Sequence, residues 1–98
     1  MVLDEVDRGR LEKGIDAIID GMPAFVQMIR SDAMKKQMPL KDENDFIVGM
    51  AWGLTLAGFL AGYQNRHNAE IPAEDLGSVG EILFRRTKDI RDAIFSLG

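Results

Sequence analysis

Residues 46–63 are eighteen consecutive residues without a charge, FIVGMAWGLTLAGFLAGY. When they are arranged as a helix with 3.6 residues per turn, bulky side chains fall on two separate seams. Small side chains form two further seams, the first made of Ala51, Thr55, Gly58 and Gly62 and the second of Gly49, Gly53, Ala57 and Ala61. A helix that is apolar on every side must be covered on every side, by protein or by lipid. We therefore expect this segment to be the central helix of the fold.

The four glycines of this segment point to close helix packing. Each glycine in a helix interior costs about 1 kcal/mol relative to alanine, so some interaction must offset the loss. The simplest one is the close approach of a neighbouring backbone, which only small residues allow. We expect Gly58→Leu and Gly62→Leu to disturb packing or assembly for this reason.

A membrane span is the alternative interpretation of residues 46–63. At 1.5 Å per residue the segment is about 27 Å long, slightly less than a hydrocarbon core of about 30 Å. The spacing of Gly49 with Gly53, and of Gly58 with Gly62, suits helix dimers in lipid. Three lysines between residues 35 and 41 would then place the N-terminal side in the cytoplasm. We favour a soluble bundle, because the segment is short for a span and the other helices carry amphipathic stripes that need cover.

The remaining sequence predicts three more helices. The first starts between Asp4 and Asp7 and ends near Asp20, and the second continues to about residue 36. Pro23 favours a break between them, because proline suits a first helical turn and disrupts a helix interior. One kinked helix over residues 11–36 is the alternative, because the apolar stripe keeps its phase through Pro23. The last helix starts at Pro72 or at Ser78, and the central one extends from about residue 42 to residue 65.

Length and composition restrict the class of protein. The 98 residues are enough for one domain, and 46% of them are hydrophobic, as in a folded soluble chain. The chain has no cysteine, which excludes disulfides and thiolate chemistry and makes the cytoplasm the default location. Its net charge of −4 argues against a general nucleic-acid binder. We predict an all-α, single-domain four-helix bundle over residues 1–98, with the glycine-rich helix at its centre.

No group of residues predicts a catalytic, cofactor or metal site. His67 is the only histidine, and with Glu70 and Glu74 it offers fewer ligands than helical metal sites use. Asp16 and Asp20 share a helix face, but acids on a helix surface are usually solvated. We therefore expect no cofactor, and we favour a binding protein over an enzyme.

One flank of the last helix is a candidate surface for a partner. It combines two aromatic and three basic residues, namely Phe84, Arg85, Lys88, Arg91 and Phe95. Aromatic rings and cations together could contact a peptide or a nucleic acid. A second packing face covered by the basic side-chain stems is the simpler explanation, because Asp89 and Asp92 lie close by.

These observations predict a small helical interaction or scaffolding module without catalytic activity, which forms a homodimer or binds another protein. The expected packing or interface residues are small or aromatic: Ala51, Thr55, Gly58, Gly62, Trp52 and Phe59. A membrane-associated protein with residues 46–63 as a single span is the first alternative. A ligand-binding protein or enzyme with a pocket near Trp52, Tyr63 and His67 is the second.

Overall fold

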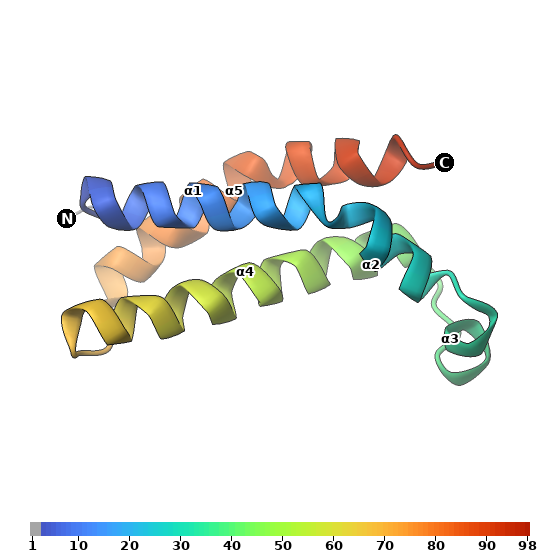
Figure 1. The fold of residues 1–98 in the computed structure, drawn as a ribbon, viewed down its shortest axis with the longest axis horizontal. Helices are drawn as coiled ribbons and strands as arrows, with labels where there is room; N and C mark the ends of the chain where they lie inside the picture. Colours follow the sequence, from blue (N-terminus) through green and yellow to red (C-terminus); the bar gives the residue numbers. More distant parts are fainter. Residues whose placement is uncertain (1–2) are drawn as a thin grey trace.

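The structure, a computed structural model, describes residues 3–98, and every regular element in this range is a helix. The helices along it are α1 (Glu5–Asp20), α2 (Met22–Ile29), α3 (Asp32–Gln37), α4 (Glu43–His67) and α5 (Ala73–Phe95). The three long helices α1, α4 and α5 pack on one another, and α4 runs antiparallel to the other two (Figure 1). The predicted all-α class is confirmed.

The predicted break near Pro23 is also confirmed. Helix α1 ends at Asp20 and α2 begins at Met22, which places Pro23 in the first turn of α2. The residue between the two helices is Gly21, whose backbone N–H donates to the carbonyl of Ala17 at 3.0 Å. The N-cap of α2 is Gly21, and no side chain caps this helix. The chain therefore bends at Gly21 instead of continuing as one straight helix (Figure 1).

The second predicted helix is wrong in its extent, because the structure divides it into α2 and α3. The division lies at Arg30 and Ser31. The Ser31 hydroxyl accepts a hydrogen bond from the Met34 backbone N–H at 3.3 Å and donates to the Met28 carbonyl at 2.9 Å. One serine thus caps the start of α3 and satisfies a carbonyl at the end of α2. The short α3 packs on α2 and lies away from the three long helices (Figure 1).

Local capping explains the boundaries of the long helices. Asp4 caps α1 by accepting from the Asp7 backbone N–H at 2.8 Å, and Asp42 caps α4 in the same way at 2.9 Å from Asp45. Helix α4 ends at Asn68, which adopts a left-handed conformation with φ of 52°. Helix α5 begins directly after Pro72, so the proline rather than Ser78 marks its start.

Two clusters of buried side chains make up the core. One lies between the start of α1, the end of α4 and the start of α5, and it includes Leu11, Phe59 and Leu83. The other lies between α2, the start of α4 and the end of α5, and it includes Met22 and Ile90. Half-buried residues such as Ile19 and Trp52 contact both clusters. All the buried side chains of α4 therefore lie on the side that faces α1, α2 and α5.

Within one chain, residues 46–63 are not covered on every side, contrary to the prediction. Helix α4 packs on α1, α2 and α5 along one side, and its other side is open to solvent. The two core clusters need only about half of the circumference of α4. Within a single chain α4 is therefore a flanking helix of a three-helix core rather than the centre of a bundle.

Candidate functional site

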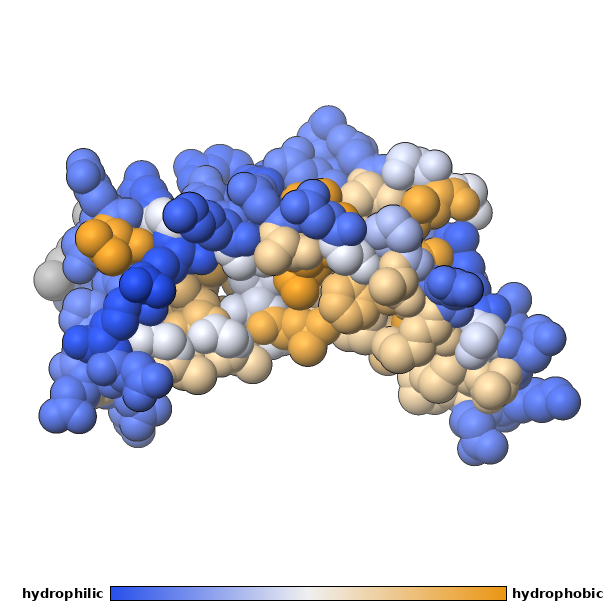
Figure 2. All heavy atoms as spheres, viewed as in Figure 1, coloured by the Kyte–Doolittle hydropathy of each residue, from blue (hydrophilic) through white to orange (hydrophobic). Residues whose placement is uncertain are grey.

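One side of α4 is an apolar strip that no other helix covers, and we call it the outer face. Its large side chains include Phe46, 36% exposed, and Leu54, 44% exposed. The same strip carries exposed small residues, namely Gly49, Gly53, Ala57 and Ala61. Figure 2 shows hydrophobic colours along the middle of α4, next to its hydrophilic end on the left. The uncharged segment identified from the sequence thus presents one apolar side to solvent.

Three of the four glycines within residues 46–63 are not explained by packing within the chain. A Cβ atom added at Gly49, Gly53 or Gly58 would meet no atom within 4 Å. At Gly62 it would meet only Nη1 of Arg66, at 3.0 Å. The packing of a single chain therefore does not require glycine at the first three positions, although each glycine costs about 1 kcal/mol of helix propensity.

A groove between α4 and α5 continues the outer face, and we call it the α4/α5 groove. It has a volume of about 980 Å³, and Trp52 and Leu56 of α4 contribute to its lining. The Trp52 indole Nε1 donates to the Thr87 hydroxyl at 2.9 Å, which fixes the ring against α5. Phe84 and Phe95 also line the groove and are 78% and 60% exposed. Large aromatic surface is therefore available beside the bare side of α4.

Ion pairs form the polar rim of the α4/α5 groove. Lys88 pairs with Asp92 at 3.1 Å, and Arg91 pairs with Asp45 of α4 at 3.0 Å. The hydrogen bond and the charge of Asp92 raise the pKa of Lys88 above its usual value. The basic residues of this flank are therefore largely neutralised by neighbouring acids, as a phosphate-binding surface would not be.

Two sets of site residues were predicted: the packing or interface residues within 46–63, which are the first set, and the partner surface on the last helix, which is the second. The structure brings part of these two sets together. Trp52 of the first set lines the same groove as four residues of the second set, Phe84, Lys88, Arg91 and Phe95. Arg85 is exposed and lies outside the lining. From the first set, Ala51, Thr55 and Phe59 are buried on the inner side of α4, while Gly58 and Gly62 line a second groove beside α1. The expected small-residue seam therefore faces α1, and the ridge starting at Gly49 is the one left bare.

Trp52 does not share a pocket with Tyr63 and His67. Eleven residues of helix separate Trp52 from Tyr63, which is about 16 Å along the axis. The rings of Tyr63 and His67 stack at 4.1 Å between centroids at the far end of α4. The Tyr63 hydroxyl donates to Asp75 of α5 at 3.3 Å, and burial together with this carboxylate raises the pKa of Tyr63. The three residues of the predicted pocket therefore lie at two separate places along α4.

A buried carboxylate joins the ends of α1 and α4, and we call this group the Asp7 cluster. Asp7 is 2% exposed, and Arg66 donates to its Oδ1 through Nε, at 3.0 Å, and through Nη2. Nε2 of His67 lies 2.8 Å from Oδ2 of Asp7. Burial acts to raise the pKa of Asp7, but the hydrogen bonds from Arg66 and His67 outweigh it and hold the pKa below its usual value. This role was not predicted from the sequence, because the partners are 59 and 60 residues apart.

Among residues 3–98, the Asp7 cluster also includes a group of possible ligand atoms for a metal ion. Asp4, Asp7 and His67 each offer one atom, and these atoms lie within 4.8 Å of one another. Both oxygens of Asp7 already accept or face a donor, however, and one of these donors is a guanidinium. A cation there would sit beside the positive charge of Arg66, so the arrangement favours an ion pair between helix ends over a metal site.

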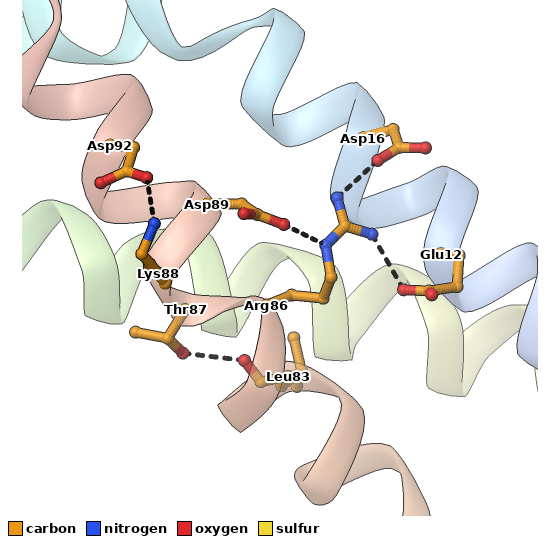
Figure 3. A network of polar contacts seen from close by, with 8 residues as sticks. All are labelled: Glu12, Asp16, Leu83, Arg86, Thr87, Lys88, Asp89 and Asp92. Carbon is orange, nitrogen blue, oxygen red and sulfur yellow. Dashed lines mark hydrogen bonds and ion pairs between the residues drawn. The ribbon is translucent and has the colours of Figure 1, made fainter.

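Arg86 closes the opposite side of the fold, between α5 and α1. Its guanidinium pairs with Glu12 at 2.9 Å and Asp16 at 2.7 Å on α1, and with Asp89 at 2.7 Å on its own helix (Figure 3). The two α1 acids therefore hold α5 in place, although Asp16 was expected from the sequence to be merely solvated. This side of the molecule is polar and internally paired, in contrast to the outer face of α4.

Comparison of the chain with known protein families, with curated proteins and with solved structures gives no match. Any functional proposal therefore depends on the surface and the side chains described above.

Proposed function

We propose that the protein is a small helical interaction module without catalytic activity, which pairs with a second copy of itself through the outer face of α4. The observation that carries this proposal is the apolar side of α4 that the chain leaves bare. Apolar surface of this extent usually marks a site of interaction with a protein or a membrane. In such a dimer α4 would be covered on both sides, which is the central position expected from its sequence.

The small residues of the outer face suit a helix as the partner. Gly49, Gly53, Ala57 and Ala61 recur every four residues and so lie along one line of the helix. A second α4 could approach this line closely, and van der Waals packing between the two backbones would offset the helix propensity that the glycines lose. A two-fold dimer needs only one self-complementary surface, which a line of small residues flanked by Phe46 and Leu54 provides.

The outer face alone is too small for a stable dimer. From residue 46 to residue 61 it is about 22 Å long, and a helix is about 10 Å wide. This strip is well below the roughly 800 Å² that each partner buries in a standard interface. The α4/α5 groove and its exposed rings Phe84 and Phe95 lie directly beside it and would supply the missing area. We therefore include both in the proposed interface.

The test is the molar mass in detergent-free buffer, measured by size-exclusion chromatography with light scattering. We expect a dimer for the wild-type chain and a monomer for Ala57→Glu and for Phe84→Asp, with unchanged helix content by circular dichroism. Gly9→Glu is the control for the added charge, because Gly9 is exposed in α1 and a Cβ atom added there would meet no atom within 4 Å. A wild-type monomer at about 100 μM, or a dimer that survives both substitutions, would overturn the proposal.

A membrane span is the second candidate, since α4 is long and apolar enough to cross a bilayer. Its inner side, however, packs on α1 and α5, which are themselves joined by the ion pairs of Arg86. Insertion of α4 would have to separate these helices or carry charged helices along. Flotation with lipid vesicles distinguishes the two candidates: a dimer remains in the dense fraction, whereas a membrane protein floats with the vesicles and needs detergent for purification.

A further inference from the structure

We propose that the groove between α1 and α4 binds a small amphipathic anion, a carboxylate or phosphate carried on a short alkyl chain. This α1/α4 groove is distinct from the α4/α5 groove and lies on the other edge of the outer face. Its volume of about 380 Å³ is in the range of small-molecule sites and too small for a helix of a partner. Arg10 and Lys13 of α1 and Arg66 of α4 line it, together with Thr55 and apolar side chains.

The charge of the groove is one-sided. Three cationic residues and no acidic residue line it, although the chain has 16 acidic and 12 basic residues in total. Arg10 and Lys13 are three residues apart, so they lie on the same face of α1. Neither has an ion-pair or hydrogen-bond partner among residues 3–98, unlike the cations of the α4/α5 groove. An anion is therefore the ligand charge that this groove complements.

Arg66 adds a third donor whose position depends on Gly62. Its Nε and Nη2 are held by Asp7, which leaves Nη1 to face the groove side of α4. Nη1 lies 3.0 Å from the place where a Cβ of residue 62 would be. A Cβ atom at residue 62 would push Nη1 away by a few tenths of an ångström, so glycine there leaves the guanidinium of Arg66 in place. The pairing with Asp7 fixes the donor before any ligand arrives.

The rest of the groove is apolar and has room. Ile18 and Leu54 contribute accessible apolar surface, and Cβ atoms added at Gly14 or Gly58 would meet nothing within 4 Å. Thr55 is 5% exposed, and its hydroxyl has no hydrogen-bond partner among the described residues. A buried hydroxyl without a partner is unfavourable, and a polar ligand atom that reached it would relieve the cost. Cations, an unpaired hydroxyl and apolar walls together match an anion with an alkyl chain.

The test is isothermal titration calorimetry with octanoate, octan-1-ol and butanoate. These probes share an alkyl chain and differ in charge or in chain length. We expect saturable binding of octanoate at one site per chain, with binding of the other two at least tenfold weaker. Binding should also weaken with added salt, because Arg10 and Lys13 are exposed. Absence of saturable octanoate binding, or equal binding of octan-1-ol, would overturn the proposal.

Substitutions distinguish binding of octanoate in the α1/α4 groove from nonspecific electrostatic attraction. Arg10→Gln with Lys13→Gln should weaken octanoate binding at least fivefold, whereas Arg8→Gln, an exposed residue of α1 outside the groove, should leave it unchanged. Gly58→Leu should fill the groove and abolish binding while the melting temperature stays the same or rises. Binding that survives Gly58→Leu, or that falls equally in Arg8→Gln, would contradict the assignment.

Two further measurements identify the source of the anion and keep the proposal independent of the dimer. Vesicles with an anionic lipid that compete with octanoate, and bind more weakly to the Gln double variant, would show that the groove takes a bilayer headgroup instead of a free amphiphile and would overturn the proposal as stated. Ala57→Glu, designed as a monomer, should bind octanoate as the wild type does. Loss of octanoate binding in a folded Ala57→Glu variant would refute a site formed within one chain.

Discussion

Replacing Asp7 by alanine should be among the most destabilising single changes in the α1–α4 contact. The Asp7 side chain is 3% exposed, while Arg66 and His67 are 22% and 37% exposed. Removing one partner of a fully buried ion pair costs about 3–5 kcal/mol, because the other charge is left without compensation. Here Arg66 and His67 can still reach water, so we expect a loss of about 2 kcal/mol in the free energy of unfolding.

The measurement is urea unfolding at one fixed protein concentration, followed by circular dichroism and by Trp52, the only tryptophan of the chain. For a chain of this length, 2 kcal/mol corresponds to a decrease of roughly 10 °C in melting temperature. Asp7→Asn keeps an acceptor oxygen and should lose about 1 kcal/mol. Asp20→Asn, at an exposed position of the same helix, is the control and should change stability by less than about 0.5 kcal/mol.

The difference in stability between the wild type and Asp7→Asn should depend on pH, in a direction that the pKa of Asp7 fixes. The pKa of Asp7 is lowered in the folded chain, because the hydrogen bonds from Arg66 and His67 outweigh the effect of burial. The stabilisation is therefore complete above the usual aspartate pKa of 3.8 and is lost as the pH falls from there towards the lower folded value. The difference between wild type and Asp7→Asn should shrink over this interval. A loss below about 0.5 kcal/mol for Asp7→Ala, or a difference that grows on acidification, would refute the reasoning.

Three other changes test the remaining contacts. Arg86→Leu removes three ion pairs whose acids are 37–61% exposed, so we expect a loss of about 1–2 kcal/mol that becomes smaller in 1 M salt; a loss independent of salt would contradict an electrostatic role. Trp52→Phe removes the hydrogen bond to Thr87 and should cost about 1 kcal/mol in urea unfolding, and Thr87→Val should add little to it in the double variant. Gly9→Ala should stabilise the chain by about 1 kcal/mol, whereas Gly62→Ala should gain less, because its Cβ meets Arg66; equal gains would show that the contact is unimportant.

Local signals in the sequence predicted the helices well. The apolar segment, preceded by acids and followed by polar residues, became α4, and α5 starts at Pro72, one of the two positions that the sequence left open. Pro23 correctly marked the break between α1 and α2. These features act within one or two turns, because a proline ring or a capping side chain affects only its neighbours. The prediction was wrong at Ser31, because it followed the helical pattern and did not consider this serine as a cap.

The candidate sites were harder to predict, because they depend on which helices cover which sides. The helical projection placed Ala51 and Thr55 on one seam and Gly49 and Gly53 on another, but it carries no information about the direction of the core. In the structure Ala51 and Thr55 of the first seam are buried against other helices, whereas Gly49 and Gly53 of the second are exposed. Trp52 and Phe84, 32 positions apart, meet at one groove only because α4 and α5 lie side by side.

Sequence alone thus determined that the chain is helical, where most helices begin and end, and that residues 46–63 carry no charge. Those properties follow from periodicity, capping and backbone restrictions, all of which operate between near neighbours in the chain. Tertiary structure decided which side of α4 faces solvent, which cations lack acidic partners, and that Asp7 meets Arg66 and His67. These outcomes depend on the relative placement of helices far apart in the chain, because burial and charge pairing are set by neighbours in space.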